Sequence, residues 1–175
     1  MPPVAVSSTY LLHPTPLGDI LIVGTPDAVI SCHPVYDDPG DDLAALTLAL
    51  RAEPSPGTTD AALQLAAQLD EYFANQRTAF DLPLLLPGTP FQQKVWHALT
   101  EIPFGTTISY DTLAKRVGSV ARAVGGANGA NRVPIVVPCH RVIGADGSLT
   151  GFGGGMHNKQ RLLELERAIT PELFA

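Results

Sequence analysis

A cysteine and a histidine are adjacent in the sequence at the point where an apolar run ends. Residues 134–137 read Pro-Ile-Val-Val, and Pro138 then precedes Cys139 and His140. Proline has no amide hydrogen to donate, so Pro138 breaks regular strand pairing and lets a bent backbone bring both side chains into one pocket. Because a nearby histidine lowers the pKa of a thiol and the thiolate is the reactive form, the pair predicts a nucleophilic cysteine. A buried structural cysteine is the alternative that the pair alone leaves open.

The chain has a second adjacent pair, Cys32 and His33, inside an expected strand. This pair lacks comparable flanking residues, and we interpret Cys32 as structural. A metal site built from both pairs is a further possibility, but zinc ligands usually recur at spacings such as C-x₂₋₄-C or H-x₃₋₅-H. Two adjacent pairs far apart in the chain do not follow that pattern, so the sequence predicts no metal and no cofactor.

A single arginine, Arg122, stands among small residues in the segment 120–127. Gly125 and Gly126 lie inside an expected helix there, where each glycine costs about 1 kcal/mol relative to alanine. Close approach of the backbone to a ligand such as DNA would account for these glycines, and tight packing in the core is the alternative. An arginine in the same segment argues against full burial.

Charge is distributed unevenly along the chain. The net charge is −6, yet residues 1–88 hold two basic and eleven acidic residues, whereas residues 89–169 hold nine basic and five acidic ones. A basic half suits a polyanion such as nucleic acid, and an acidic half that only maintains solubility is the alternative. No apolar run approaches the roughly 20 residues of a membrane span, and no signal peptide is visible. We expect a cytoplasmic protein without a membrane partner.

The first half has the pattern of an α/β domain. Short strands are expected at 8–13, 19–25 and 28–35, with turn residues between them, which predicts an antiparallel meander. Helices are expected at 41–51 and from Asp60 onward, the second with an apolar stripe at Leu65, Leu69 and Phe73. Pro87 and Gly88 suggest a boundary, so we infer two domains, residues 1–88 and 89–175.

The second half begins with a capping box. Thr89, Pro90 and Gln92 suit the N-cap, first and third positions of a helix. Two further short helices are expected at 110–117, capped by Ser109, and after Ser119. The tight turn between them at Gly118 is typical of a helix-turn-helix.

A hairpin and a last helix complete the second half. Asp146-Gly147 between residues 142–143 and 148–149 is a hairpin signal. The combination of helix-turn-helix and hairpin predicts a winged-helix-like domain, and residues 157–168 predict the last helix. The fold class is therefore α+β.

Together these residues resemble the O6-alkylguanine-DNA alkyltransferases, also called methylated-DNA–protein-cysteine methyltransferases. The resemblance covers nearly all of residues 89–167, whereas the N-terminal half is similar only in general pattern. For that half, the resemblance implies a ribonuclease-H-like domain. The matching segments are Phe91-Gln-Gln-Lys-Val-Trp96, Ile108-Ser-Tyr110, Ala121-Arg-Ala-Val-Gly-Gly-Ala127, Asn131, Val137-Pro-Cys-His-Arg-Val142 and Thr150-Gly-Phe-Gly-Gly-Gly155.

The resemblance implies a catalytic group of five residues. Cys139 would accept the alkyl group, and His140 would take the thiol proton through a water. Glu166 would polarise His140, and Asn131 would hold the active-site turn. Tyr110 would help to rotate the damaged nucleotide out of the duplex. Each side chain alone also has an ordinary structural interpretation, so the joint match carries the prediction.

The resemblance also implies a DNA surface and a base pocket. Arg122 would enter the duplex where the damaged nucleotide leaves, on the minor-groove side. The other implied DNA-contacting residues are Tyr110, Ala121, Gly125 and Gly126. The implied lining of the alkyl-base pocket is Phe152, Gly153 and Val142.

The implied reaction is a single irreversible alkyl transfer. A methyl or larger alkyl group would move from O6-alkylguanine, and from O4-alkylthymine, to Cys139 of a methylated-DNA–protein-cysteine S-methyltransferase. The thioether product has no acyl carbon for water to attack, so each molecule would act once. The partner would be double-stranded DNA, bound by a monomer.

Some residues depart from the family pattern, and other functions compete. Arg132 replaces a frequent proline, Phe152 replaces a tyrosine, and only Cys32, His13 and His33 remain where zinc-binding relatives hold their metal. A lesion-binding protein without transfer, a Cys-His hydrolase and a winged-helix regulator are the alternatives. The presence of Cys139 disfavours the first, and no separate oxyanion loop supports the second.

Overall fold

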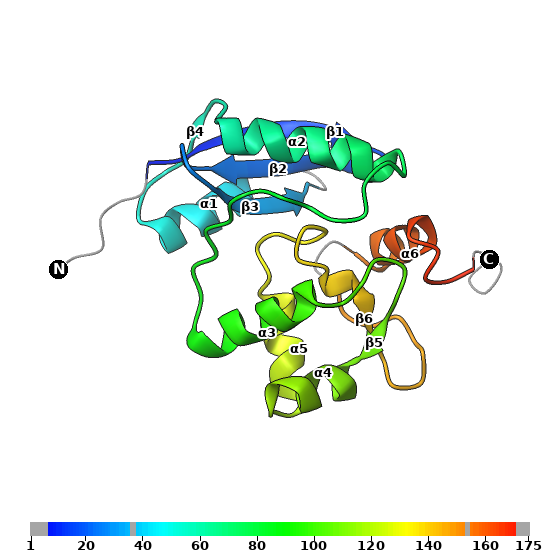
Figure 1. Ribbon diagram of the computed structural model, residues 1–175. Helices are drawn as coiled ribbons and strands as arrows, with labels where there is room; N and C mark the ends of the chain where they lie inside the picture. Colours follow the sequence, from blue (N-terminus) through cyan, green and yellow to red (C-terminus); the bar gives the residue numbers. More distant parts are fainter. Residues whose placement is uncertain (1–6, 36–37, 153–154, 171–175) are drawn as a thin grey trace. The chain divides into compact units, whose positions relative to one another are not determined.

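The computed structural model describes residues 7–35, 38–152 and 155–170. The chain divides into two compact units, residues 1–86 and 87–175 (Figure 1). Within the described residues, no helix combines the length and apolar character that crossing a membrane requires.

The first unit contains a four-stranded sheet. Its strands are β1 (Thr9–Thr15), β2 (Gly18–Gly24), β3 (Val29–Pro34) and β4 (Ser55–Pro56), in the order β3-β2-β1-β4. The first three pair antiparallel in sequence order, which confirms the predicted meander, and β4 adds parallel to β1.

Helices α1 (Gly40–Leu50) and α2 (Asp60–Phe73) cover this sheet (Figure 1). Leu21 and Val23 of β2 pack with Leu46 and Leu50 of α1 in one buried cluster. Alternate residues of a strand face opposite sides, so the fully buried Ile20 and Ile22 face the side that α2 covers. The predicted α/β character of this half is confirmed.

The second unit is mainly helical. It contains α3 (Pro90–Thr100), β5 (Ile108–Ser109), α4 (Tyr110–Val117), α5 (Ala121–Gly129), a 3₁₀ turn at Cys139–Arg141, β6 (Val142–Ile143) and α6 (Met156–Leu165). Helices α3, α4 and α5 contact one another, and α4 and α5 form the predicted helix-turn-helix.

The helix starts in this unit follow local signals. The side chains and backbone of Thr89 and Gln92 form the predicted capping box of α3, with Pro90 at its start. Ser109 caps α4, and Gly118 ends it in the left-handed conformation at φ 68°. The indole N–H of Trp96 donates to the backbone carbonyl of Ala127 at 2.8 Å, which fixes α3 against α5.

Three local predictions for this unit were wrong. Val120, not Ser119, is at the N-cap of α5, and no side chain caps that helix. Residues 148–149 form no strand, and β6 pairs parallel with β5, although the expected turn is closed by the Gly147 N–H donating to the Gly144 carbonyl at 3.0 Å and by the Gly144 N–H donating to the Ser148 carbonyl at 2.8 Å. The last helix ends at Leu165, earlier than expected.

Candidate active site

The loop after α5 positions Cys139. The side chain of Asn131 spans this loop: its Oδ1 accepts from the Val133 N–H at 3.0 Å, and its Nδ2 donates to the Val137 carbonyl at 2.8 Å. Between these contacts Ile135 adopts φ 76°, an uncommon conformation for a β-branched residue that is costly unless its surroundings enforce it. The loop leads to Pro138 and then to the 3₁₀ turn that starts at Cys139, which is 5% exposed.

A buried carboxylate connects His140 and Arg141. Glu166 Oε1 lies 2.8 Å from His140 Nε2, and Arg141 donates to both oxygens of Glu166 at 2.8 and 2.9 Å. Arg141 also donates to the Ile102 carbonyl at 2.6 Å. Burial would raise the pKa of Glu166, but the hydrogen bonds from His140 and Arg141 outweigh it and hold the pKa at about 2. Glu166 is therefore an anion that orients its two neighbours.

The histidine is held in its neutral form. Burial lowers the pKa of His140 below its usual range, although Glu166 partly opposes that effect. A neutral ring beside an ionised carboxylate carries its proton on Nε2, which leaves Nδ1 as an acceptor. Nδ1 is buried and has no hydrogen-bond partner among the described residues. His140 is thus arranged to receive a proton at Nδ1.

The thiol of Cys139 is less acidic than the Cys-His pair suggested. Burial raises its pKa to about 11, although the Asn131 side chain and the charge of Lys159 act in the opposite direction. The expected lowering of the pKa by the adjacent histidine is therefore wrong for the resting protein. The site holds a protonated thiol beside a neutral base.

Lys159 is a buried cation that we did not predict. Its Nζ donates to the carbonyls of Val142 and Thr150 at 2.6 and 2.8 Å, and it lies 5.9 Å from the centre of the Tyr110 ring. Burial lowers the pKa of Lys159 to about 8, although a thiolate at Cys139 would act in the opposite direction. The sequence did contain a signal for the burial of Lys159. It lies three residues before Leu162 and four before Leu163, which places it on the apolar side of α6.

Tyr110 is half-buried at the start of α4. Its hydroxyl donates to the Thr150 carbonyl at 3.1 Å and accepts from Asn128 Nδ2 at 3.5 Å. Burial raises its pKa above the usual range. Val142 is fully buried and Phe152 half-buried, whereas Gly153 lies outside the described residues.

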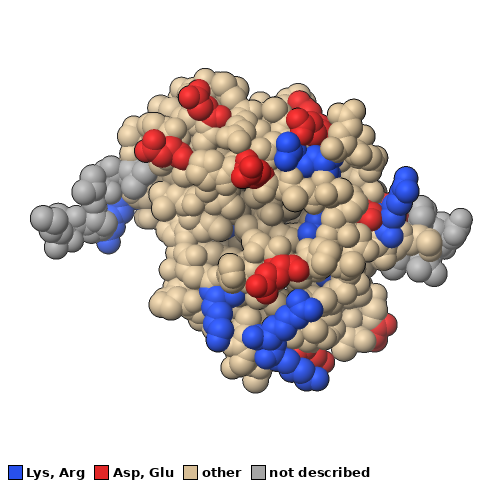
Figure 2. Space-filling model, in the orientation of Figure 1, with Lys and Arg blue, Asp and Glu red and all other residues tan. Residues whose placement is uncertain are grey.

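Apart from Tyr110, which begins α4, the expected DNA-contacting residues lie on α5. Arg122 and Gly126 are exposed, and Ala121 and Gly125 are half-buried. A Cβ atom added to Gly125 or Gly126 would meet nothing within 4 Å, so packing within the unit does not require these glycines. Figure 2 shows lysine and arginine side chains gathered over helices of the second unit.

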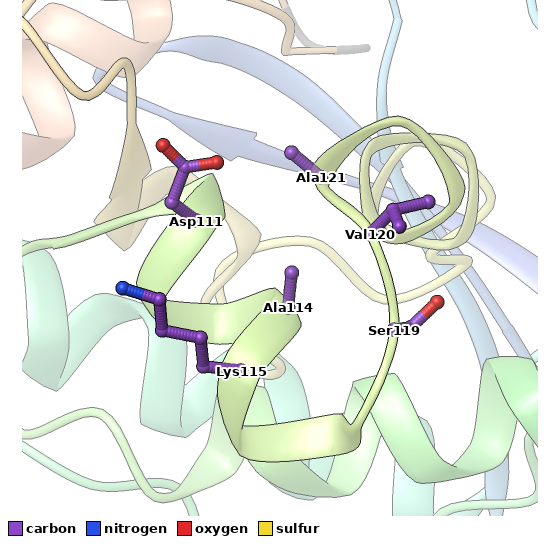
Figure 3. Close-up of a pocket in the computed structure, with 6 residues that line it drawn as sticks. All are labelled: Asp111, Ala114, Lys115, Ser119, Val120 and Ala121. Atoms are coloured by element: carbon purple, nitrogen blue, oxygen red, sulfur yellow. The ribbon is translucent and has the colours of Figure 1, made fainter.

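A hollow lies between α4 and α5 (Figure 3). Side chains from both helices and from the turn between them surround it. The lining residues are Asp111, Ala114, Lys115, Ser119, Val120 and Ala121. Cys139 is not among them, so this hollow is distinct from the thiol site. Among the described residues, no group of three or more His, Cys, Asp or Glu side chains is placed to hold a metal ion.

Two family models match almost the whole chain. The model described as "6-O-methylguanine DNA methyltransferase, ribonuclease-like domain" matches residues 8–86. The one described as "6-O-methylguanine DNA methyltransferase, DNA binding domain" matches residues 90–168.

Several curated proteins are similar to the chain. The methylated-DNA–protein-cysteine methyltransferase of Mycobacterium tuberculosis is 53% identical over 120 residues, which cover 67% of this chain and 71% of that protein. The constitutive methylated-DNA–protein-cysteine methyltransferase of Bacillus subtilis is 43% identical over 161 residues, which cover 90% and 94%.

Solved structures show the same architecture. The crystal structure of Mycobacterium tuberculosis O6-methylguanine methyltransferase superposes with a TM-score of 0.76 at 40% identity, over 96% of this chain and 99% of that one. A complex of the Mycobacterium tuberculosis protein with DNA gives a TM-score of 0.77 at 41% identity, over 93% and 94%.

Proposed function

The chain belongs to the 6-O-methylguanine DNA methyltransferase family, and from that premise we propose that Cys139 accepts the alkyl group. Its activity is methylated-DNA–protein-cysteine methyl transfer, the repair of O6-methylguanine in DNA. The chain has two cysteines, and Cys32 is completely buried in β3, where burial raises its pKa to about 12. The observation that carries the proposal is that Cys139 adjoins a neutral histidine held by a buried carboxylate.

The transfer is an in-line displacement at a saturated carbon. The thiol proton passes through a water to His140 Nδ1, and Glu166 stabilises the imidazolium that forms. Sγ bonds to the alkyl carbon as the carbon–oxygen bond breaks, and the electron pair of that bond leaves with the base oxygen. The base then takes up a proton and becomes ordinary guanine. The thioether is stable to water, so the protein is consumed.

The damaged nucleotide must leave the duplex before the thiol can reach it. Extrusion of a base costs a few kcal/mol. The exposed Arg122 would fill the vacated space, and Ala121, Gly125 and Gly126 would allow α5 to approach the minor groove closely. We propose that a monomer binds double-stranded DNA carrying O6-alkylguanine or O4-alkylthymine in this way, at the nucleoid in the cytoplasm.

The extruded base would enter a pocket beside Cys139. Tyr110, Val142 and Phe152 would line it together with the amide of Gly153. Asn131 supports the nucleophile by closing the loop before it.

Titration with excess lesion tests the stoichiometry. When the protein is incubated with a tenfold excess of duplex DNA containing O6-methylguanine, its intact mass should rise by one methyl group and repair should stop at one lesion per molecule. A matched duplex without the lesion is the control and should leave the mass unchanged. Repeated turnover, or tight binding with no gain in mass, would contradict single-use transfer and support the hydrolase or the lesion-binding alternative.

A further inference from the structure

A second asparagine reaches the nucleophile's turn from α5. Asn128 lies in the last turn of that helix and is 4% exposed. Its Nδ2 lies 3.4 Å from the backbone carbonyl of Cys139 and 3.5 Å from the hydroxyl oxygen of Tyr110. One amide group thus links the backbone of the nucleophile to the tyrosine of the pocket.

Neither the Cys139 carbonyl nor the Tyr110 hydroxyl depends on Asn128 for its hydrogen bonding. The Cys139 carbonyl also accepts from the Val142 N–H, and the Tyr110 hydroxyl also donates to the Thr150 carbonyl. Both contacts of Asn128 are long for hydrogen bonds and therefore weak. Its Oδ1 is buried and has no hydrogen-bond partner among the described residues, which costs stability. An apolar side chain of similar size would suit folding at this position at least as well.

The amide restricts the direction of the tyrosine hydroxyl, which donates to the Thr150 carbonyl and has the Gly151 carbonyl as a second acceptor at 3.4 Å. Because Asn128 Nδ2 donates to a lone pair of the Tyr110 oxygen, the hydroxyl proton must point away from Asn128, as it does toward Thr150. The same NH₂ group also donates to the carbonyl of Cys139 at 3.4 Å and so links the hydroxyl to the 3₁₀ turn. We propose that Asn128 is a positioning residue for the transfer reaction, acting through Tyr110. This inference rests on the proposed roles of Cys139 and Tyr110.

The test separates rate from stability. In Asn128→Leu, the single-turnover rate on O6-methylguanine duplex DNA should fall about tenfold, the factor for one ordinary hydrogen bond lost from a transition state. The thermal unfolding midpoint should stay the same or rise, because the buried Oδ1 is gone. A slower rate at an unchanged midpoint is not what a merely structural residue would give.

A buried glutamine in the first unit provides the matched control. Gln68 makes two good hydrogen bonds with the backbone of Asp81, at 2.7 and 2.9 Å. Gln68→Leu should therefore lower the unfolding midpoint and leave the transfer rate of the folded protein unchanged. The opposite responses of the two substitutions would show that the amide of Asn128 acts on the reaction.

A double-mutant cycle tests the route through Tyr110. Addition of Asn128→Leu to Tyr110→Phe should slow transfer by less than about twofold, because the hydroxyl that Asn128 orients is already absent. The inference would be overturned if the double variant lost rate by the product of the two single losses, or if Asn128→Leu reacted at the wild-type rate. Should Asn128→Leu fail to fold, Asn128→Ala carries the same expectations for the rate and the cycle. Failure of the wild-type protein to methylate Cys139 would instead overturn the proposed function.

Discussion

At the scale of single residues, burial rather than charge governs the resting thiol. With a pKa of about 11, Cys139 is protonated at neutral pH, and deprotonation there costs about 5 kcal/mol. In the proposed mechanism, a neutral His140, whose Nδ1 has no hydrogen-bond partner among the described residues, takes that proton when an alkylated base is in place. On that mechanism the thiolate forms only during the reaction, and the protonated thiol would be protected from unrelated electrophiles between repair events.

The carboxylate of Glu166 predicts a loss of stability in acid. Its pKa lies below the ordinary value of 4.5, at about 2, so it favours the folded state above pH 4.5. That contribution, on the order of 3 kcal/mol, is lost as the pH falls from about 4.5 through 2. Urea unfolding measured between pH 7 and 2 should show the decline in the wild-type protein and a smaller decline in Glu166→Gln.

Glu166→Gln should also be less stable at pH 7. The substitution removes the negative charge that balances the buried guanidinium of Arg141. Equal stability of the two proteins at pH 7, with parallel curves down to pH 2, would show that the carboxylate is not ionised in the folded protein.

At the scale of elements, α5 carries the exposed Arg122 beside small residues that would allow DNA to approach the helix closely. Arg122→Ala should slow repair of duplex DNA by about 100-fold, because extrusion of the nucleotide costs a few kcal/mol. The reaction with a free O6-alkylguanine base, which needs no extrusion, should change less than about twofold. Rates on both substrates can be measured in single-turnover experiments.

Arg161→Ala is the matched control for Arg122→Ala. It removes the same charge from another exposed helical position, on α6. It should have little effect on either substrate. Equal losses on duplex and free base in Arg122→Ala would remove the proposed role of Arg122 in extrusion.

The elements that were predicted correctly are determined by residues that are close together in the sequence. The capping box of Thr89 and Gln92 and the left-handed Gly118 are local signals, and both elements formed as expected. The hairpin after Val142 was predicted only in part: its turn closes through the Gly144 N–H and the Ser148 carbonyl, but the strand pairing of Val142–Ile143 is with Ile108–Ser109, a partner far away in the sequence.

The residues of the candidate site also differ in how far the sequence alone could predict them. The resemblance pointed to Cys139, His140 and Glu166, and the structure places Cys139 and His140 in one 3₁₀ turn and joins His140 to Glu166 by a hydrogen bond. Lys159 and Asn128 were not predicted, since what distinguishes them is burial and contact with backbone carbonyls that belong to other elements. The pKa of Cys139 was misjudged for the same reason: burial in the tertiary structure outweighs an adjacent residue.

At the scale of the whole molecule, the chain separates acidic and basic residues between two units. The basic residues concentrate in the unit that matches a DNA-binding model, while the acidic first unit matches a ribonuclease-like model. A negative net charge therefore does not disfavour DNA binding, because the charge that a polyanion meets is local.

The most direct test of the acceptor is to locate the methyl group after repair. Duplex DNA with an isotopically labelled O6-methylguanine is mixed with the wild-type protein, Cys139→Ser or Cys32→Ser, and the digested proteins are mapped by mass spectrometry. We predict the label on Cys139 in the wild type and in Cys32→Ser, and no label in Cys139→Ser. Label on Cys32, or labelled protein from Cys139→Ser, would contradict the assignment of Cys139 as the acceptor.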